Sequence, residues 1–285
     1  MRYGVTMFVT DLSIDVVDLA RAVEARGLDS LWLPEHTHIP TSRTTTHPSG
    51  GELPEKYKRS IDPLVGLAAA AVATSGLRLG TGILLPAQRD PIVTAKAVAT
   101  LDLVSGGRLS LGVGFGWNQD EIADHGVAFR QRRAVAREHV LAMRELWGDD
   151  VASFSGEHVE VAPSWSWPKP VQHGADGRPA VPVLMGGMAG PKLLAHAVDY
   201  ADGWMPVGGA GLSQALPELR AALEEAGRDP ATFAVVPTAV LPERGKLDHY
   251  ADLGVTETVF DLPSAPRDEV LPVLDRYAAL VAERR

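Results

Sequence analysis

Two histidines after an apolar run are the first residues in this sequence that suggest chemistry. His36 and His38 follow the run SLWLP at residues 30–34, and their spacing could begin a metal site. A metal-dependent hydrolase needs several histidine or carboxylate ligands that converge from different strands. The later apolar runs end in LMGG, WMPVG and TAVLP, which supply no such ligand. The sequence therefore predicts no metal site.

Covalent catalysis is disfavoured as well. The chain has no cysteine, which excludes a cysteine nucleophile, a thiolate zinc site and any disulfide. A Schiff-base enzyme on parallel strands needs a lysine at a strand end, and all six lysines fall in segments that read as loops or helices. No serine stands in the nucleophile-elbow motif of the hydrolases.

What the ends of the apolar runs do offer is glycine. The stretch 108–121 reads RLSLGVGFGWNQDE, and GGMAGP at 186–191 leads from an expected strand into an expected helix. Backbone N–H groups at such a junction suit a phosphate. The dinucleotide fingerprint is absent, because Trp117 stands where its third glycine would fall. These features indicate a site for a flat phosphorylated ring, a flavin or its deaza analogue.

The elements that position these residues alternate strictly between strand and helix. We expect strands at residues 2–8, 30–34, 78–85, 108–114, 181–186, 203–207, 232–240 and 257–262. We expect helices near 13–26, 62–75, 91–104, 131–147, 190–201, 213–226, 246–253 and 267–283. Eight such pairs in 285 residues predict a (β/α)8 TIM barrel that occupies residues 1–285 as a single domain.

Two long segments do not fit this repeat. Residues 37–61 follow the second strand, and residues 151–180 precede the fifth. Segments of this length inside a compact domain are usually functional loops. We expect both to be insertions over the mouth of the barrel, the end at which its strands finish and where barrel enzymes keep their active sites.

Composition limits the partners of the protein. The formal net charge of −9 disfavours binding to nucleic acid or to an anionic membrane. No apolar run approaches the roughly 20 residues that span a bilayer. The first residues, MRYGVTMFVTDLS, do not read as a secretory signal. We therefore expect a cytoplasmic protein that acts on a small molecule.

Several motifs resemble the luciferase-like monooxygenase superfamily, in particular its branch that depends on the deazaflavin coenzyme F420. The matching segments cover most of residues 1–207 in the order of the family, and the tail matches only in its strand–helix rhythm. They are SLWLPEH (30–36), LGTGILLP (79–86), LDLVSGGRLSLGVGFGWNQDE (101–121), RQRRAVAREHVLAMRELW (130–147), PKPVQ (168–172) and VPVLMGG with AVDYADGW (181–204).

The resemblance implies roles for individual residues at the barrel mouth. His36 matches an active-site histidine near the reacting ring face, and Glu35 would tune or anchor it. Gly82-Ile83 matches a cis peptide bond that backs the central ring. The residues implied to bind the coenzyme are Thr81, Gly82, Ile83, Gly114, Asp120, Gly186, Gly187 and Met188, with Asp120 at the pyrimidine edge and Gly186 and Gly187 at the phosphate.

One position departs from the family pattern. The sugar-phosphate dehydrogenases of the family carry a catalytic glutamate where this chain has Trp117, which argues against that activity. We expect Trp117 and Asn118 to line the substrate pocket. His36 is then the best remaining proton donor or acceptor, because its unperturbed pKa lies near 6.5.

The expected function is therefore transfer of a hydride between coenzyme F420 and a small organic substrate, in a protein that resembles homodimeric relatives. Two alternatives stay open. One is an FMN-dependent monooxygenase that uses reduced flavin and oxygen. The other is a non-catalytic protein that binds flavin or deazaflavin. The observation that motivates it is Trp117 in place of the catalytic glutamate. The sequence predicts neither the substrate nor the direction of the reaction.

Overall fold

Eight parallel strands form one sheet that curves into a barrel. The structure is a computed structural model that describes residues 1–209 and 211–285. The strand order is β10-β1-β2-β3-β4-β7-β8-β9. The strands are β1 (Arg2–Thr6), β2 (Ser30–Leu33), β3 (Arg78–Leu84), β4 (Leu109–Val113), β7 (Val183–Gly186), β8 (Gly203–Met205), β9 (Ala234–Val235) and β10 (Glu257–Asp261). Hydrogen bonds from Thr256 to Val235 and from Val259 to Pro237 join the last two strands. The predicted (β/α)8 barrel is confirmed.

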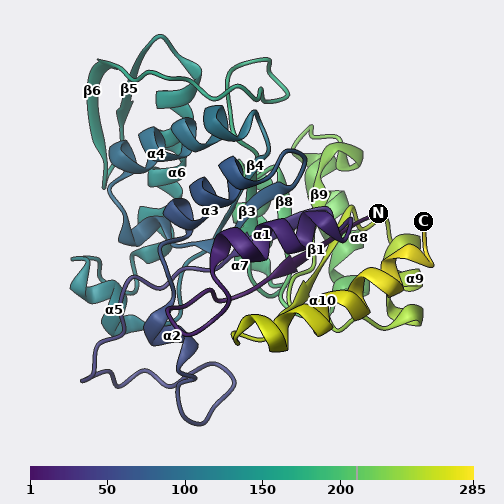
Figure 1. Cartoon of the computed structure of the whole chain (residues 1–285). Coiled ribbons are helices and arrows are strands. Elements are labelled where there is room, and N and C mark those ends of the chain that lie inside the picture. The colour runs from purple at the N-terminus through teal and green to yellow at the C-terminus, as the bar shows by residue number, and fades with distance from the viewer. Residues whose placement is uncertain (210) are drawn as a thin grey trace.

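Helices cover the outside of this barrel (Figure 1). The main ones are α1 (Val16–Ala25), α3 (Pro63–Ala73), α4 (Pro91–Ser105), α6 (Arg132–Gly148), α7 (Pro191–Tyr200), α8 (Leu212–Glu225), α9 (Arg244–Asp252) and α10 (Arg267–Ala282). Shorter ones are α2 (Lys56–Arg59), α5 (Gln119–Asp124), η1 (Pro86–Gln88) and η2 (Pro230–Thr232). The side chains of Asp62 and Asp90 cap α3 and α4, each followed by proline in the first turn. Among the described residues, none of these helices has the length and apolar character that crossing a membrane requires.

Strand β9 is shorter than predicted. The sequence suggested a strand over residues 232–240, but only Ala234–Val235 pair as a strand, with isolated bridges at Val207–Thr238 and Val240–Phe260. Pro237 interrupts the run, because proline has no N–H to donate to a neighbouring strand.

The interior of the barrel is filled by Trp32, which lies 2% exposed among apolar side chains from five other strands. A Cβ added at Gly80 would lie 2.2 Å from the Trp32 ring, and one at Gly112 would lie 2.1 Å from the carbonyl oxygen of Thr81. A Cβ at Gly114 would lie 2.1 Å from Ile83. These three glycines therefore make room for internal packing and do not present bare backbone to a ligand, which corrects part of the sequence interpretation.

The two long insertions lie at opposite ends of the barrel. Residues 37–61 follow β2, so they lie at the mouth as expected. Residues 151–180 follow α6, which has already returned the chain to the other end, and the prediction that they cover the mouth is wrong. They form the hairpin of β5 (Val151–Ser155) and β6 (Glu160–Trp165) beside α6, and residues 173–182 line a cavity at the amino ends of the strands. Figure 1 shows this hairpin far from α2 and α5, which lie at the mouth.

Candidate active site

A cavity of about 650 Å³ opens at the mouth of the barrel. Its walls come from the ends of β1, β2, β3, β4, β7 and β10 and from the loop 37–61. Convergence of strand ends on one opening is the usual location of the active site in this fold. The cavity is large enough for a drug-sized ligand.

His36 lies in this cavity and is held by a buried carboxylate. Its Nδ1 lies 2.7 Å from Oε2 of Glu121, and the two side chains are 6% and 0% exposed. The other oxygen of Glu121 accepts the backbone N–H of Thr37 at 3.1 Å. An ionised Glu121 keeps a proton on Nδ1, so that Nε2 is the nitrogen left to face the cavity. A histidine oriented in this way can accept or donate one proton at Nε2.

Among the described residues, the carboxylate of Glu35 makes no hydrogen bond to the ring of His36. One of its oxygens accepts the N–H of Leu85 at 2.6 Å, and the other accepts Nε of Arg89 at 2.6 Å. Burial raises the pKa of Glu35, while Arg89 opposes that effect, and Arg89 also pairs with Asp62. The interpretation that Glu35 anchors the histidine is therefore wrong. Both its oxygens are occupied in joining the end of β2 to the segment after β3.

Aromatic rings surround His36 and form one wall of the cavity. The ring centroid of His36 lies 5.1 Å from that of Tyr57 and 5.7 Å from that of Trp117. Phe8 packs on Tyr57 at 4.7 Å, and His47 contacts Tyr57 at 4.9 Å and Trp117 at 5.4 Å. Burial lowers the pKa of His47, which favours its uncharged form. This set of four rings, from Phe8, His47, Tyr57 and Trp117, is called the aromatic wall below.

The other side of the cavity is cationic. Arg132 and Arg133, at the start of α6, line it, and their Nε atoms are buried without a hydrogen-bond partner among the described residues. Gly187 and Met188 line the same side and lead into α7, whose first residues have no side-chain cap. An uncapped helix start beside two guanidinium groups suits a phosphate. The residues present therefore fit a phosphorylated coenzyme.

The predicted coenzyme residues divide into two groups. The cavity is lined by Gly82, Ile83, Gly186, Gly187 and Met188, and the peptide bond between Gly82 and Ile83 is cis. The residues that do not line it are Thr81, Gly114 and Asp120.

The three residues that do not line the cavity, Thr81, Gly114 and Asp120, make other contacts. Thr81 is buried and donates to the carbonyl of Gly112 at 2.7 Å, and Gly114 packs against Ile83. The carboxylate of Asp120 accepts the hydroxyl of Thr45 at 2.8 Å, together with two backbone N–H groups of the loop 37–61. Asp120 therefore anchors that loop, and its contact with the pyrimidine edge of the coenzyme stays a prediction.

Of the two residues predicted to line the substrate pocket, one lines the cavity and the other does not. Trp117 lies in the aromatic wall, whereas Asn118 is 1% exposed, does not line the cavity, and has no partner for its side-chain amide among the described residues. Within the described ranges, no group of three histidine, cysteine or acidic side chains is placed to hold a metal ion.

Sequence reasoning missed Glu121, the arginine pair and three members of the aromatic wall, Phe8, His47 and Tyr57. Glu121 stands in the first turn of α5, which follows β4, and the arginines stand in the first turn of α6. All three lie inside segments that resemble the family, and this was the available signal. His47 and Tyr57 belong to the loop 37–61, whose sequence has no periodicity that would place them.

Comparisons with known proteins place these features in a family. The profile of the luciferase-like monooxygenases matches residues 13–241. An uncharacterized protein of Mycobacterium tuberculosis is 42% identical over 286 residues, which cover 99% of each chain. The F420-dependent glucose-6-phosphate dehydrogenase of Amycolatopsis mediterranei is 33% identical over 215 residues, covering 74% of this chain and 58% of that one.

One solved structure extends the comparison to the whole fold. An F420-dependent secondary alcohol dehydrogenase, in complex with an F420–acetone adduct, superimposes with a TM-score of 0.76 and covers 100% of both chains. At 19% sequence identity this likeness concerns the fold alone.

Proposed function

Since the chain belongs to the luciferase-like monooxygenase family, we propose that it is an F420-dependent oxidoreductase acting on a small organic substrate. The observation that carries the proposal is the layout of the mouth cavity. His36, oriented by Glu121, faces the same cavity as the arginine pair and the uncapped start of α7. A proton-transfer group and a phosphate seat in one opening suit a redox coenzyme together with its substrate.

One side of the cavity would bind the coenzyme, and the other carries the proton-transfer group. Arg132, Arg133 and the segment 186–188 would hold the phosphate, and the Gly82-Ile83 segment would back the ring. When bound, the deazaflavin supplies the centre that accepts or returns a hydride. His36 takes or gives the proton of the substrate oxygen at Nε2, and Glu121 stabilises the imidazolium that forms.

The aromatic wall supports an uncharged substrate, an alcohol or a carbonyl compound. Two cations lie near the aromatic wall among the described residues. Lys56 lies over the Phe8 ring at 4.9 Å and close to Asp261, and Arg43 lies near His47 and donates to the carbonyl of Thr45. Burial raises the pKa of Asp261, and Lys56 opposes that effect. A sugar phosphate would find no free guanidinium pair on this side. Together with Trp117 in place of an acid, this favours an apolar organic substrate over glucose 6-phosphate.

The test is a titration of the purified protein with F420 and with FMN, followed by a screen of neutral alcohols and ketones for change in F420 absorbance. We expect tighter binding of F420 and turnover of at least one neutral substrate. Substitution His36→Ala should leave F420 affinity within about threefold and lower turnover about 100-fold or more, since general acid–base catalysis contributes about 10²–10⁴. Full turnover in this variant would contradict the assignment.

The alternative is an FMN-dependent monooxygenase, which the description of the matched family favours. It predicts tighter binding of FMN than of F420 and oxygen consumption with reduced FMN. The second alternative, a non-catalytic binding protein, predicts coenzyme binding without any turnover. The same titration and screen therefore separate all three.

We also propose that the protein is a homodimer, formed through the outer faces of α3 and α4. Helix α3 has no charged residue, yet Val65 and Val72 are 72% and 76% exposed. The adjacent α4 exposes Val93, Leu103 and Val104. A helix that is apolar all round is normally covered, and a second copy offers the same apolar face in a two-fold arrangement. Sedimentation should give twice the monomer mass, and Val72→Glu should give the monomer.

A further inference from the structure

A second cavity lies at the opposite end of the barrel, at the amino ends of the strands. It has a volume of about 590 Å³ and is called the floor cavity. Trp32, Leu184 and Val236 form its apolar inner wall, and residues 173–182 form part of its rim. This volume falls in the range of small-molecule sites. Its place on the far side of Trp32 separates it from the mouth cavity.

The carboxylates that line the floor cavity already have partners. Glu257 accepts Nε of Arg2 and Nε1 of Trp32, each at 3.0 Å. Asp202 accepts Arg144 at 2.6 Å and the N–H of Val183 at 2.8 Å. The third, Asp229, caps the turn at residues 230–232.

One of the lining arginines is also fully engaged. The guanidinium of Arg228 donates to the carbonyls of Val198 and Ala201 at the end of α7, at 2.7 and 2.6 Å. It is therefore occupied in closing that helix end, and it offers little to a ligand.

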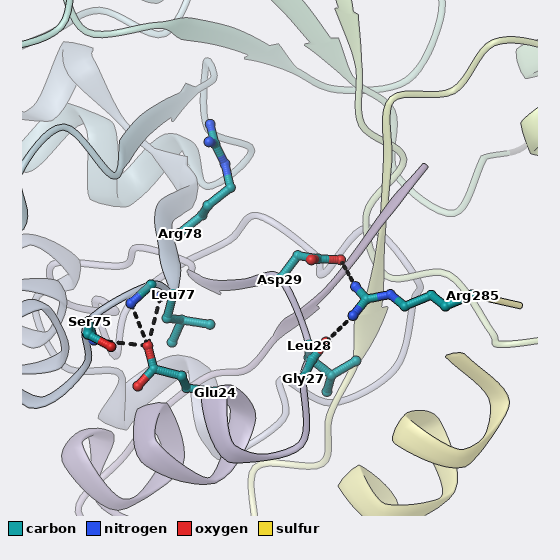
Figure 2. Close-up of a pocket in the computed structure, with 9 residues that line it drawn as sticks. Glu24, Gly27, Leu28, Asp29, Ser75, Leu77, Arg78 and Arg285 are labelled. Carbon is teal, nitrogen blue, oxygen red and sulfur yellow. Dashed lines mark hydrogen bonds and ion pairs between the residues drawn. The ribbon is translucent and has the colours of Figure 1, made fainter. Parts of the chain in front are cut away.

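Arg78 is different. Its side chain is half-buried, and within residues 1–209 and 211–285 it makes no side-chain hydrogen bond and no ion pair. Figure 2 shows it extending away from both Glu24 and Asp29, while Arg285 takes the carboxylate of Asp29. Burial and the nearby positive charge of Arg2 lower the pKa of Arg78, while the carboxylates of Glu257 and Asp29 oppose that effect. Those two carboxylates are bonded to Arg2 and Arg285, so the half-buried guanidinium of Arg78 has no direct anionic partner among the described residues.

We propose that the floor cavity binds an organic carboxylate, which bridges Arg78 and the free end of Arg2 and lays its apolar body against Trp32. In the part of the chain that the structure describes, Arg2 bonds Glu257 through Nε and its terminal nitrogens have no partner. The guanidinium fork matches the two oxygens of a carboxylate. The apolar inner wall selects a carboxylate with a hydrocarbon or aromatic body over a bare inorganic anion. This site is independent of the proposed redox function.

The alternative is that Arg78 only supports the fold. The two roles make opposite predictions for the protein without ligand. A structural arginine stabilises the chain, so its loss lowers the melting temperature. An arginine kept for an anion carries an uncompensated desolvation cost, so its replacement by an apolar side chain of similar length leaves the melting temperature unchanged or raises it.

The experiment is thermal unfolding of the full chain in buffers of matched ionic strength that contain chloride, acetate, phosphate or benzoate. We expect saturating benzoate to raise the Tm of the wild-type protein by about 2–4 °C and acetate to raise it less. Arg78→Met should keep or exceed the wild-type Tm in chloride and lose the response to benzoate. The matched control is Arg276→Met on exposed α10, where the arginine donates only to the carbonyl of Pro272, and it should keep the full response.

Two results would overturn the proposal. One is an equal Tm in chloride, phosphate and benzoate, which would mean that the protein responds to ionic strength alone. The other is a lower Tm for Arg78→Met in chloride together with an unchanged response to benzoate, which would make Arg78 a structural residue. Calorimetric titration with benzoate gives a second measure, because binding should be lost in Arg78→Met and kept in Arg276→Met.

Discussion

Replacing Glu121 by glutamine separates the positioning of His36 from its presence. The variant keeps the size of the side chain and an oxygen that can accept the N–H of Thr37, so we expect the fold to persist. It loses the negative charge 2.7 Å from Nδ1 of His36, at a site where the carboxylate is fully buried. The imidazolium that forms during turnover then lacks its partner.

The size of the effect follows from that contact. A hydrogen bond to a charged group contributes about 1.5–3 kcal/mol. Each 1.36 kcal/mol of barrier changes the rate tenfold. Glu121→Gln should therefore lower kcat about 10- to 150-fold. KM and the affinity for F420 should stay within about threefold, because Glu121 does not line the cavity.

The assay measures kcat and KM with a neutral substrate from the screen, and the Kd of F420 by fluorescence. The matched control is Asp124→Asn, which removes a carboxylate of the same helix that pairs with exposed His38 at 3.0 Å. This control should change kcat less than threefold, since exposed ion pairs contribute little. Equal losses in the two variants, or an unchanged kcat in Glu121→Gln, would refute the positioning role.

Three further predictions concern stability and the loop at the mouth. Gly80→Ala places a Cβ 2.2 Å from the Trp32 ring, so it should lower the free energy of unfolding in urea by about 1–3 kcal/mol. In the control Gly245→Ala the added Cβ meets nothing within 4 Å, so the free energy of unfolding should not fall. Glu24 accepts the N–H groups of residues 75–77, which hold its pKa below the ordinary 4.5. This stabilisation is complete above pH 4.5 and is lost as the pH falls through the folded pKa. Glu24→Gln should therefore lower Tm at pH 7, and a scan into acid should erase the difference. Asp120→Ala should speed proteolysis within residues 41–55 and raise the substrate KM, and a cleavage rate equal to that of wild type would contradict the anchoring role.

Local patterns in the sequence determined most of the fold. The apolar strands and their strict alternation with helical segments predicted eight strand–helix pairs, because each signal depends on residues only a few positions apart. The family motifs pointed to His36 and to the segment 186–188. The predicted place of residues 151–180 was wrong because it did not take into account which element precedes them. A segment that follows a helix begins at the opposite end of the barrel from one that follows a strand.

Closure of the barrel alone decided which side chains meet. Glu121 stands 85 positions from His36, and no spacing rule in the sequence selects it over Glu35, the immediate neighbour. The register of β2 against β3 and β4 brings the two together, while Glu35 is turned toward Arg89. The same closure gathers Arg2 and Arg78 on the floor. Contacts between distant segments depend on how the strands align in space, and that alignment exists only in the folded barrel.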